Sequence, residues 1–131
     1  MGLKAPFIGG NGFNSPKVIE IAKEAAEGLI VATPWFGEKS DPKVKAFVAK
    51  YEKAYGKKPD QFAAQAYDAF YIMTNALKAA GTADRAKLRD ALAATKNFQG
   101  VVGMFSFDAE RDVVMTPSVL IVKGGKFTIF N

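Results

Sequence analysis

The first third of the chain alternates short apolar runs with a glycine-rich segment. Residues 5–9 (APFIG) and 29–33 (LIVAT) each have the length and composition of a buried strand. Between them, apolar residues recur with helical spacing at Val18, Ile21, Ala22, Ala25 and Ala26, and Gly28 follows where a helix terminator is expected. The pattern predicts a βαβ unit, with two parallel strands and a right-handed crossover.

The segment GGNGFNSPKV, residues 9–18, follows the first predicted strand. Ser15 and Pro16 are typical of the N-cap and the first position of a helix. The loop therefore ends at a helix N-terminus, whose free N–H groups favour an anionic group. Because open α/β sheets bind ligands at the carboxyl ends of their strands, this loop is a candidate ligand site.

Three further helices are predicted in the middle of the chain. One opens at Asp41–Pro42, ends at Gly56 and carries an apolar stripe of Val44, Phe47, Val48, Tyr51 and Tyr55. The next runs from Asp60 to Gly81, and we expect it to be well buried because alanines flank an apolar side made of Ala63, Ala66, Tyr67, Phe70, Tyr71, Thr74 and Leu77. The last starts near Asp84 and presents Leu88, Ala91, Leu92 and Thr95.

From Val101 onward the helical period gives way to alternation. Gly124–Gly125 separates two alternating runs, SVLIVK and KFTIF, which is a strong signal of a β-hairpin. We expect Val119, Ile121, Phe127 and Ile129 to face the core.

Composition narrows the chemistry. The chain has 131 residues, a hydrophobic fraction of 49% and a net charge of +5 carried by scattered lysines, which favours one ordered domain with a solvated surface over a nucleic-acid-binding patch. With no cysteine and no histidine, the chain has no disulfide, thiolate nucleophile, imidazole base or Cys/His zinc site. Residues 1–15 lack a signal-peptide pattern, so we expect either a cytoplasmic protein or a mature or excised piece of a longer one.

Motifs of enzymes and cofactor sites are incomplete. Gly10-Asn11-Gly12 resembles the dinucleotide fingerprint, but its third small position is the helix cap Ser15. Asp108, Glu110 and Asp112 are spaced like the start of a calcium loop, although a polar turn between strands fits better because Val113 and Val119 occupy the later ligand positions. We therefore expect no catalytic residue, no metal and no cofactor.

For three aromatic residues, neither helical nor strand periodicity predicts burial in the core. Phe13 lies in the glycine loop, and Trp35 and Phe36 follow the second strand. Since both places follow strand carboxyl ends, we expect them to border one cleft, where Trp35 either contacts a ligand or packs under a neighbouring loop.

Four ordered segments, GLKAPFIGGNGFNSP, EAAEGLIVATPWF, FVAKYEKAYGKKPDQFAAQAYDA and GMFSFDAERD, resemble one family. They are similar to the carboxy-terminal part of a type I periplasmic binding protein, in the amino-acid receptor branch of ABC transporters. The resemblance implies a flavodoxin- or Rossmann-like three-layer α/β architecture. Residues 1–131 would then form one α/β segment: a βαβ part of the second lobe (1–34), helices that pack on the first lobe (35–107), and the last crossing with the β-hairpin (108–131).

The resemblance also implies a function. Such receptors bind an amino acid or similar small polar solute between two lobes and deliver it to an ABC permease, so the parent would be periplasmic or extracellular. The implied site has Gly10, Asn11, Gly12 and Phe13 at the polar end of the solute and Trp35 over its apolar part, with Ala32, Thr33 and Pro34 in a hinge. Asn11 stands where the family commonly has an acidic residue, and an amide cannot form an ion pair with an ammonium group. A carboxylate, an amide or another neutral solute is therefore an alternative to an amino acid.

The family comparison further implies that most of the first lobe is absent. Uncovered strand edges and apolar helix faces favour pairing with another chain, so we expect a homo-oligomer, for example a domain-swapped dimer, with weak or no solute binding in isolation. The alternative is a self-contained α/β structural or interaction module, a designed or evolutionary half-receptor without a ligand.

Overall fold

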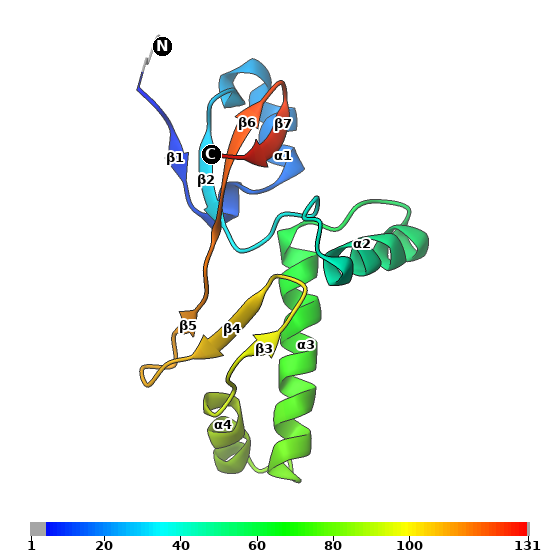
Figure 1. The fold of residues 1–131 in the computed structure, drawn as a ribbon, viewed down its shortest axis with the longest axis vertical. Helices are drawn as coiled ribbons and strands as arrows, with labels where there is room; N and C mark the ends of the chain where they lie inside the picture. Colours follow the sequence, from blue (N-terminus) through cyan, green and yellow to red (C-terminus); the bar gives the residue numbers. More distant parts are fainter. Residues whose placement is uncertain (1–4, 131) are drawn as a thin grey trace. The chain divides into compact units, whose positions relative to one another are not determined.

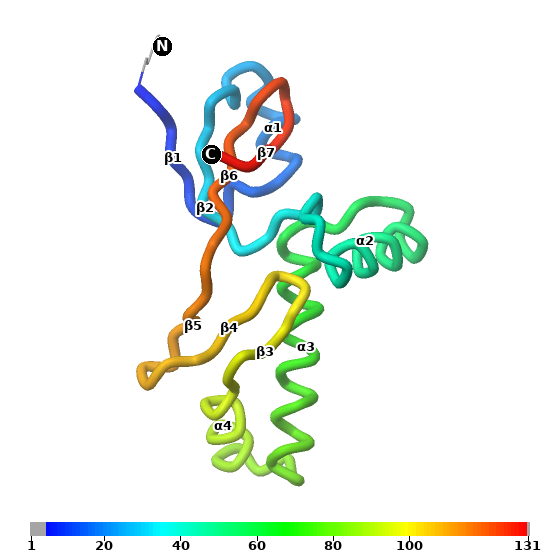
Figure 2. Tube along the Cα trace, viewed as in Figure 1, coloured from blue at the N-terminus to red at the C-terminus, as the bar shows by residue number. Residues whose placement is uncertain are grey.

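The computed structural model describes residues 5–130 and divides the chain into two compact units. The first unit is Met1–Phe36 with Pro117–Asn131, and the second is Gly37–Thr116. Residues 1–4 and 131, which belong to the first and last predicted parts, lie outside the described residues. The chain passes from the first unit to the second after Phe36 and returns before Pro117 (Figure 2).

The first unit is built on a four-stranded sheet. Its strands are β1 (Ile8–Gly9), β2 (Ile30–Thr33), β6 (Ser118–Lys123) and β7 (Lys126–Ile129), in the order β1-β2-β6-β7. β1 and β2 are parallel, and the other neighbours are antiparallel, so the blue and red ends of the chain share one sheet (Figure 1). The parallel pair and the β6–β7 hairpin are confirmed, and the two hairpin glycines have the positive φ values of 57° and 72° that such a turn requires.

One short helix covers one face of this sheet. α1 (Pro16–Ala22) begins at the predicted cap, where the Ser15 hydroxyl accepts a hydrogen bond from the Lys17 N–H, and a 3₁₀ turn, η2 (Lys23–Ala26), follows it. The core joins Ala26, Leu29, Val31 and Val122 to the partly buried Val18, Ile19, Ala22 and Phe127.

The predicted apolar stripe was wrong at Ile21 and Ala25. Ile21 is 79% exposed and Ala25 is exposed, whereas Ile19 packs on the core. The physical reason is the break after Ala22, where Lys23 has a φ of 51° and the chain tightens into η2. A single helical period therefore does not extend to Ala26.

Two predictions for the strands also need correction. The first strand is not a buried strand over 5–9: only Ile8–Gly9 pairs, and Ile8 is 76% exposed, because β1 is an edge strand with one neighbour. In the hairpin, Leu120 and Val122 are fully buried and Val119 is exposed. On β7, Phe127 packs on the core as predicted, whereas Ile129 pairs with Leu120 but is exposed because β7 is an edge strand. The alternation along β6 was predicted correctly, but the wrong set of residues was assigned to the core. Leu120 and Val122 face it, because α1 covers only the face of the sheet that carries Val31 and Val122.

The second unit combines three helices with a small antiparallel sheet. α2 (Pro42–Tyr55), α3 (Gln61–Ala80) and α4 (Arg85–Ala93) begin at the predicted places, and the side chains of Asp41, Asp60 and Asp84 cap them. The sheet has the order β3-β4-β5, with β3 (Phe98–Gln99), β4 (Met104–Phe107) and β5 (Val113–Val114), and β3 was not predicted. A polar turn closed by Asp108 and Asp112 joins β4 to β5.

α3 is much less buried than expected. Its buried residues are Gln61, Ala64, Asp68 and Ala76, whereas Phe70 of the predicted apolar side is 68% exposed and Tyr71 is 44% exposed. The helix packs on α4 and on the segment at Val101, which together cover one side of it (Figure 1). The expectation of a well-buried helix is therefore wrong for this chain.

Candidate functional site

The glycine loop leaves β1 and folds into a short 3₁₀ turn, η1 (Asn11–Phe13), before α1 begins. The Phe13 N–H donates to the Gly10 carbonyl and the Asn14 N–H donates to the Asn11 carbonyl, each at 3.0 Å. These bonds give the loop a compact backbone at the carboxyl end of β1, where the sequence placed the ligand site.

Asn14 ties this loop to the end of β2. Its side chain is buried, and Nδ2 donates to the Thr33 hydroxyl at 2.9 Å and to the Trp35 carbonyl at 2.8 Å. An amide nitrogen has two hydrogens, so these bonds use both of them. Asn14 therefore fixes the distance between the loop and the segment that leaves the first unit.

Thr33 connects Asn11 to the same network. Its hydroxyl accepts from Asn14 Nδ2 and from the Trp35 N–H, and donates to Asn11 Oδ1 at 2.9 Å. One donated and two accepted bonds are all that a hydroxyl group can form. The position of the partly buried Asn11 side chain is thus set by a fully buried threonine.

The loop glycines act through their small size. Gly10 has a φ of −80°, and neither Gly9 nor Gly12 is among the described glycines with positive φ. A Cβ on Gly9 would lie 2.7 Å from the Phe13 ring, so that ring folds back over the strand end. Around Gly10 and Gly12 a Cβ would meet nothing within 4 Å, so the backbone there faces open space.

The backbone N–H groups of Gly12 and Phe13, which were expected to hold a solute, differ in their hydrogen bonding. The Phe13 N–H is used inside η1, whereas within residues 5–130 the Gly12 N–H has no protein acceptor. Gly12 therefore presents a free donor at the open surface of the loop, and Phe13 contributes a ring that is 50% exposed.

The remaining predicted residues lie at the end of β2. Trp35 is only 4% exposed and its backbone accepts from Asn14, while Ala32 lies on the sheet face opposite to Thr33 because side chains alternate along a strand. Pro34 follows β2 directly. The structure thus brings Asn11, Thr33 and Trp35 into one hydrogen-bonded group with the glycine loop beside it.

Sequence reasoning missed Asn14. The available signal was its position between a glycine loop and a helix cap, where short polar side chains often bond to nearby backbone. Its partners lie 19 and 21 residues away, which no local pattern reveals.

The second unit contains a separate cavity of about 360 Å³ between α2, α3 and β3, with Lys43, Phe47, Asp68 and Tyr71 in its lining. Buried Asp68 accepts hydrogen bonds from the N–H groups of Val101 (2.8 Å) and Val102 (2.9 Å). Burial raises the pKa of Asp68, against the opposing effect of these bonds and of Lys43. This carboxylate attaches the segment after β3 to α3, which is a structural role.

Two kinds of site or segment are absent from the described part of the chain. Residues 5–130 contain no group of three or more His, Cys, Asp or Glu side chains placed to hold a metal ion. Within the same residues, none of the helices has the length and apolar character needed to cross a membrane.

Comparison with known proteins gives consistent matches. A family model described as periplasmic binding protein matches residues 1–125. The Leu/Ile/Val-binding protein homolog 2 of Brucella abortus is 34% identical over 99% of this chain and 36% of its own length. The leucine binding protein of Thermotoga maritima superposes with a TM-score of 0.88 at 34% identity, over 99% of this chain and 37% of its own.

A third matched protein was solved with a ligand that is not an amino acid. A solute binding protein from an ABC transporter of R. palustris, solved in complex with benzoate, superposes with a TM-score of 0.77 at 30% identity, over 94% of this chain and 34% of its own. The chain spans about a third of the length of the curated relatives that it matches.

Proposed function

The chain belongs to the periplasmic binding protein family, and we propose that it is a non-catalytic segment of a solute receptor that serves ABC-type uptake. The observation that carries this proposal is the family match over residues 1–125, together with relatives described as binding proteins for leucine, isoleucine and valine. In this proposal the complete receptor works in the periplasm or outside the cell and meets an ABC permease.

The glycine loop forms one wall of the solute site. The free Gly12 N–H and the Asn11 amide hold the polar end of the solute, and the exposed Phe13 ring lies beside it. Open space at Gly10 and Gly12 supports this role because a solute can reach the backbone there. Trp35 limits the apolar side of the site from its buried position.

Asn11 bears on the class of solute. Its oxygen already accepts from Thr33, and a neutral amide gives an ammonium group no ion pair. An amino acid is the solute of the leucine binding relative, whereas benzoate has a carboxylate and no ammonium. The proposed solute is therefore a small molecule with a polar end, either an amino acid or a related carboxylate or amide.

Ala32, Thr33 and Pro34 form the hinge of this receptor. They stand at the end of β2, shortly before the chain leaves the first unit after Phe36. Closure of two lobes around a solute needs such a short segment, in which a few residues absorb the change in backbone angles.

We also propose that the chain on its own self-associates and binds solute weakly. Strand β1 is exposed at the edge of its sheet, and apolar side chains of α3 are exposed as well. One wall of a cleft leaves a solute largely hydrated, so little binding energy is gained.

Calorimetric titration of the chain with leucine, isoleucine and benzoate tests this proposal. The expected dissociation constants are weaker than about 1 mM. Submillimolar binding of a common amino acid would contradict the proposal that the chain holds only part of the site. If the chain also fails to bind any solute after it is built into a complete receptor, the alternative of an α/β interaction module without a ligand applies.

A further inference from the structure

Side chains from the glycine loop and from the end of β2 form a short chain of hydrogen bonds. Asn14 Nδ2 donates to the Thr33 hydroxyl, and the Thr33 hydroxyl donates to Asn11 Oδ1, both at 2.9 Å. Because Thr33 and Asn14 are buried, protein partners satisfy their hydrogen-bonding groups. The chain of bonds links the interior of the first unit to the polar side chain that is proposed to touch the solute.

The Trp35 carbonyl sets the direction of the first bond. This backbone oxygen can only accept, and it lies 2.8 Å from an atom of the Asn14 amide. That atom is the nitrogen, because an amide oxygen in its place would set two acceptors against each other. The same nitrogen lies 2.9 Å from the Thr33 hydroxyl oxygen, so its second hydrogen points there.

The Thr33 hydroxyl is then left with one hydrogen to donate. Its oxygen accepts from Asn14 Nδ2 and, at 3.2 Å, from the Trp35 N–H, and these bonds use both lone pairs. The Trp35 carbonyl is a poorer acceptor for the hydroxyl hydrogen, since it lies 3.4 Å away and already accepts from Asn14. The hydrogen therefore goes to Asn11, and the atom of Asn11 that faces Thr33 is the oxygen.

This order of donors and acceptors fixes the orientation of the Asn11 amide. With Oδ1 turned to Thr33, Nδ2 is on the other branch of the side chain, away from the hydroxyl. An amide nitrogen carries two hydrogens, and one is sufficient to bind a solute atom. Asn11 therefore offers the solute a donor, although an asparagine that is not held in this way could offer a donor or an acceptor.

The surroundings of Asn11 favour the same chemistry. The next residue, Gly12, has an N–H without a protein acceptor within residues 5–130, so it is a second donor at the loop. Neither residues 9–16 nor residues 29–36 include an aspartate or a glutamate. A carboxylate forms charge-assisted bonds with such N–H groups, whereas an ammonium group needs acceptors.

From these observations we propose that Asn11 binds an acceptor oxygen of the solute, best supplied by a carboxylate, and that Thr33 is the positioning residue for this preference. This role rests on the solute site proposed above and names the group that the loop selects. An amino acid would place its carboxylate, rather than its ammonium group, against Asn11. A solute with a carboxylate and no ammonium would satisfy the loop equally well.

Two probes with the same branched carbon chain test this preference. Isovalerate ends in a carboxylate at neutral pH, and isopentylammonium ends in an ammonium group. Each is titrated to about 100 mM into the isotope-labelled chain at constant ionic strength, because weak binding is expected. NMR follows the side-chain NH2 signal of Asn11 and the backbone N–H signal of Gly12. The dissociation constant should be at least about tenfold lower for isovalerate than for isopentylammonium.

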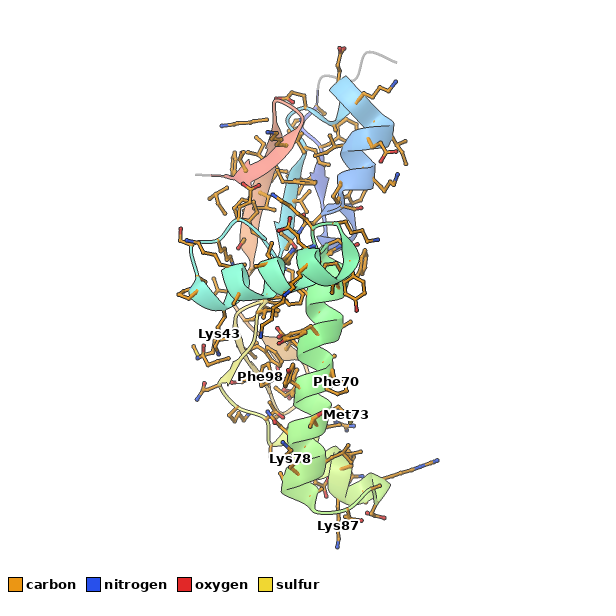
Figure 3. All side chains as sticks on the ribbon, turned by 90° about the vertical axis from the view of Figure 1, so that its right-hand side faces the viewer. Lys43, Phe70, Met73, Lys78, Lys87 and Phe98 are labelled. Atoms are coloured by element: carbon orange, nitrogen blue, oxygen red, sulfur yellow. The ribbon has the colours of Figure 1, made fainter. Side chains whose placement is uncertain are left out.

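Asn97 provides the internal control for these titrations. It has an exposed side chain in the second unit and precedes Phe98, which is labelled in Figure 3. Its side-chain NH2 signal should respond to neither probe. Equal responses of Asn97 and Asn11 would show nonspecific contact and would overturn the proposed preference.

Substitutions at Thr33 separate positioning from a purely structural role. Thr33→Val keeps the shape of the side chain and removes the hydroxyl, so Asn11 loses the partner that orients it. The preference for isovalerate should fall below about threefold. Thr33→Ser retains a hydroxyl and should keep a preference of about tenfold, which would not follow if Thr33 acted through packing alone.

NOEs in the native chain test the orientation of Asn11 without any substitution, and they decide the matter if Thr33→Val does not fold. The Thr33 hydroxyl hydrogen should show a strong NOE to the side-chain NH2 group of Asn14 and a much weaker one to that of Asn11. Equally strong NOEs would mean that Asn11 turns its nitrogen to Thr33, and would overturn the proposed preference.

The titrations also separate this preference from the proposed solute site. Tighter binding of isopentylammonium than of isovalerate would overturn the preference, while the loop would remain one wall of a site. Shifts of the Gly12 signal with leucine, but with neither probe, would have the same meaning. A loop that responds to none of these three compounds would contradict both the preference and the site.

Discussion

Asn14 is buried and uses both hydrogens of its side-chain amide, one on the Thr33 hydroxyl and one on the Trp35 carbonyl. Both acceptors lie on the segment that ends β2 and leads out of the first unit. At the scale of single residues, the geometry of the proposed solute site therefore depends on a side chain that need not touch the solute.

Replacement of Asn14 by alanine should destabilise the first unit by about 1–3 kcal/mol, because buried acceptors lose their donors. Urea unfolding followed by the fluorescence of Trp35, the one tryptophan of the chain, measures this effect. Asn75→Ala, at an exposed position of α3, is the control and should change stability by less than about 0.5 kcal/mol. Equal effects of the two substitutions would show that the network contributes nothing.

Asp68 provides a prediction about pH. Burial raises the pKa of its carboxyl group above the usual value of an aspartate. A raised folded-state pKa means that this group contributes stability below about pH 4 and that the contribution is lost as the pH rises through the folded pKa. In Asp68→Asn this titration is absent, so the stability advantage of the native chain over the variant should shrink as the pH rises above about 4 and through the raised pKa of Asp68.

At neutral pH the Asp68→Asn variant should still be less stable by about 1–3 kcal/mol, because the two N–H groups of Val101 and Val102 bond to different oxygens and one of these becomes an NH2 donor in asparagine. Denaturant unfolding at several pH values, followed by circular dichroism, measures both effects. Asp60→Asn, at a helix cap where asparagine is an equally good residue, is the control. An advantage that grows with pH would contradict the prediction.

At the scale of elements, the turn after β3 is packed tightly against α3. A Cβ on Gly100 would lie 2.2 Å from a carboxylate oxygen of Asp68. We expect Gly100→Ala to cost about 1–3 kcal/mol, because either the turn or the helix must shift. Gly12→Ala, where nothing lies within 4 Å of the added Cβ, should change stability by less than about 0.5 kcal/mol. Thermal unfolding compares the two variants, and a costly Gly12→Ala would show that the loop is not open.

Elements whose signals are local could be predicted from the sequence. Asp41, Asp60 and Asp84 cap the helices because a cap depends on its own next few residues. The hairpin at Gly124–Gly125 follows from turn geometry in the same way.

Features that depend on distant parts of the chain could not be predicted. Which face of β6 is buried depends on the face that α1 covers, and alternation alone leaves Leu120 and Val119 equally plausible. The exposure of Phe70 depends on what packs against α3, and the role of Asn14 depends on partners across the loop. In the candidate site, the loop could therefore be placed from the sequence, but not the bonds that hold it.

At the scale of the whole molecule, the chain keeps the backbone of a binding protein over about a third of its relatives' length. Its open glycine loop and the exposed apolar side chains of α3, Phe62 and Phe70 among them, have the character of surfaces that the rest of a receptor covers. We propose that the loop supplies one wall of a solute site, which becomes effective when an opposite wall is present.

A hybrid receptor also tests the role of Asn11. In this hybrid, residues 1–131 take the place of the matching third of the leucine binding protein of Thermotoga maritima. Asn11→Asp in the hybrid keeps an oxygen for the Thr33 hydroxyl and adds a negative charge, so it should shift selectivity toward solutes with an ammonium group. Competition between leucine and benzoate measures the shift, and unchanged selectivity would remove Asn11 from the site.

Calorimetric titration of the same hybrid with a panel of amino acids and small carboxylates shows whether the glycine loop forms one wall of a solute site. We expect a folded hybrid to bind at least one of these solutes with a submillimolar dissociation constant. Gly12→Val should weaken this binding at least about tenfold, because the added side chain fills the open space at the loop. A folded hybrid that binds no member of the panel, or whose binding is indifferent to Gly12→Val, would contradict this role of the loop.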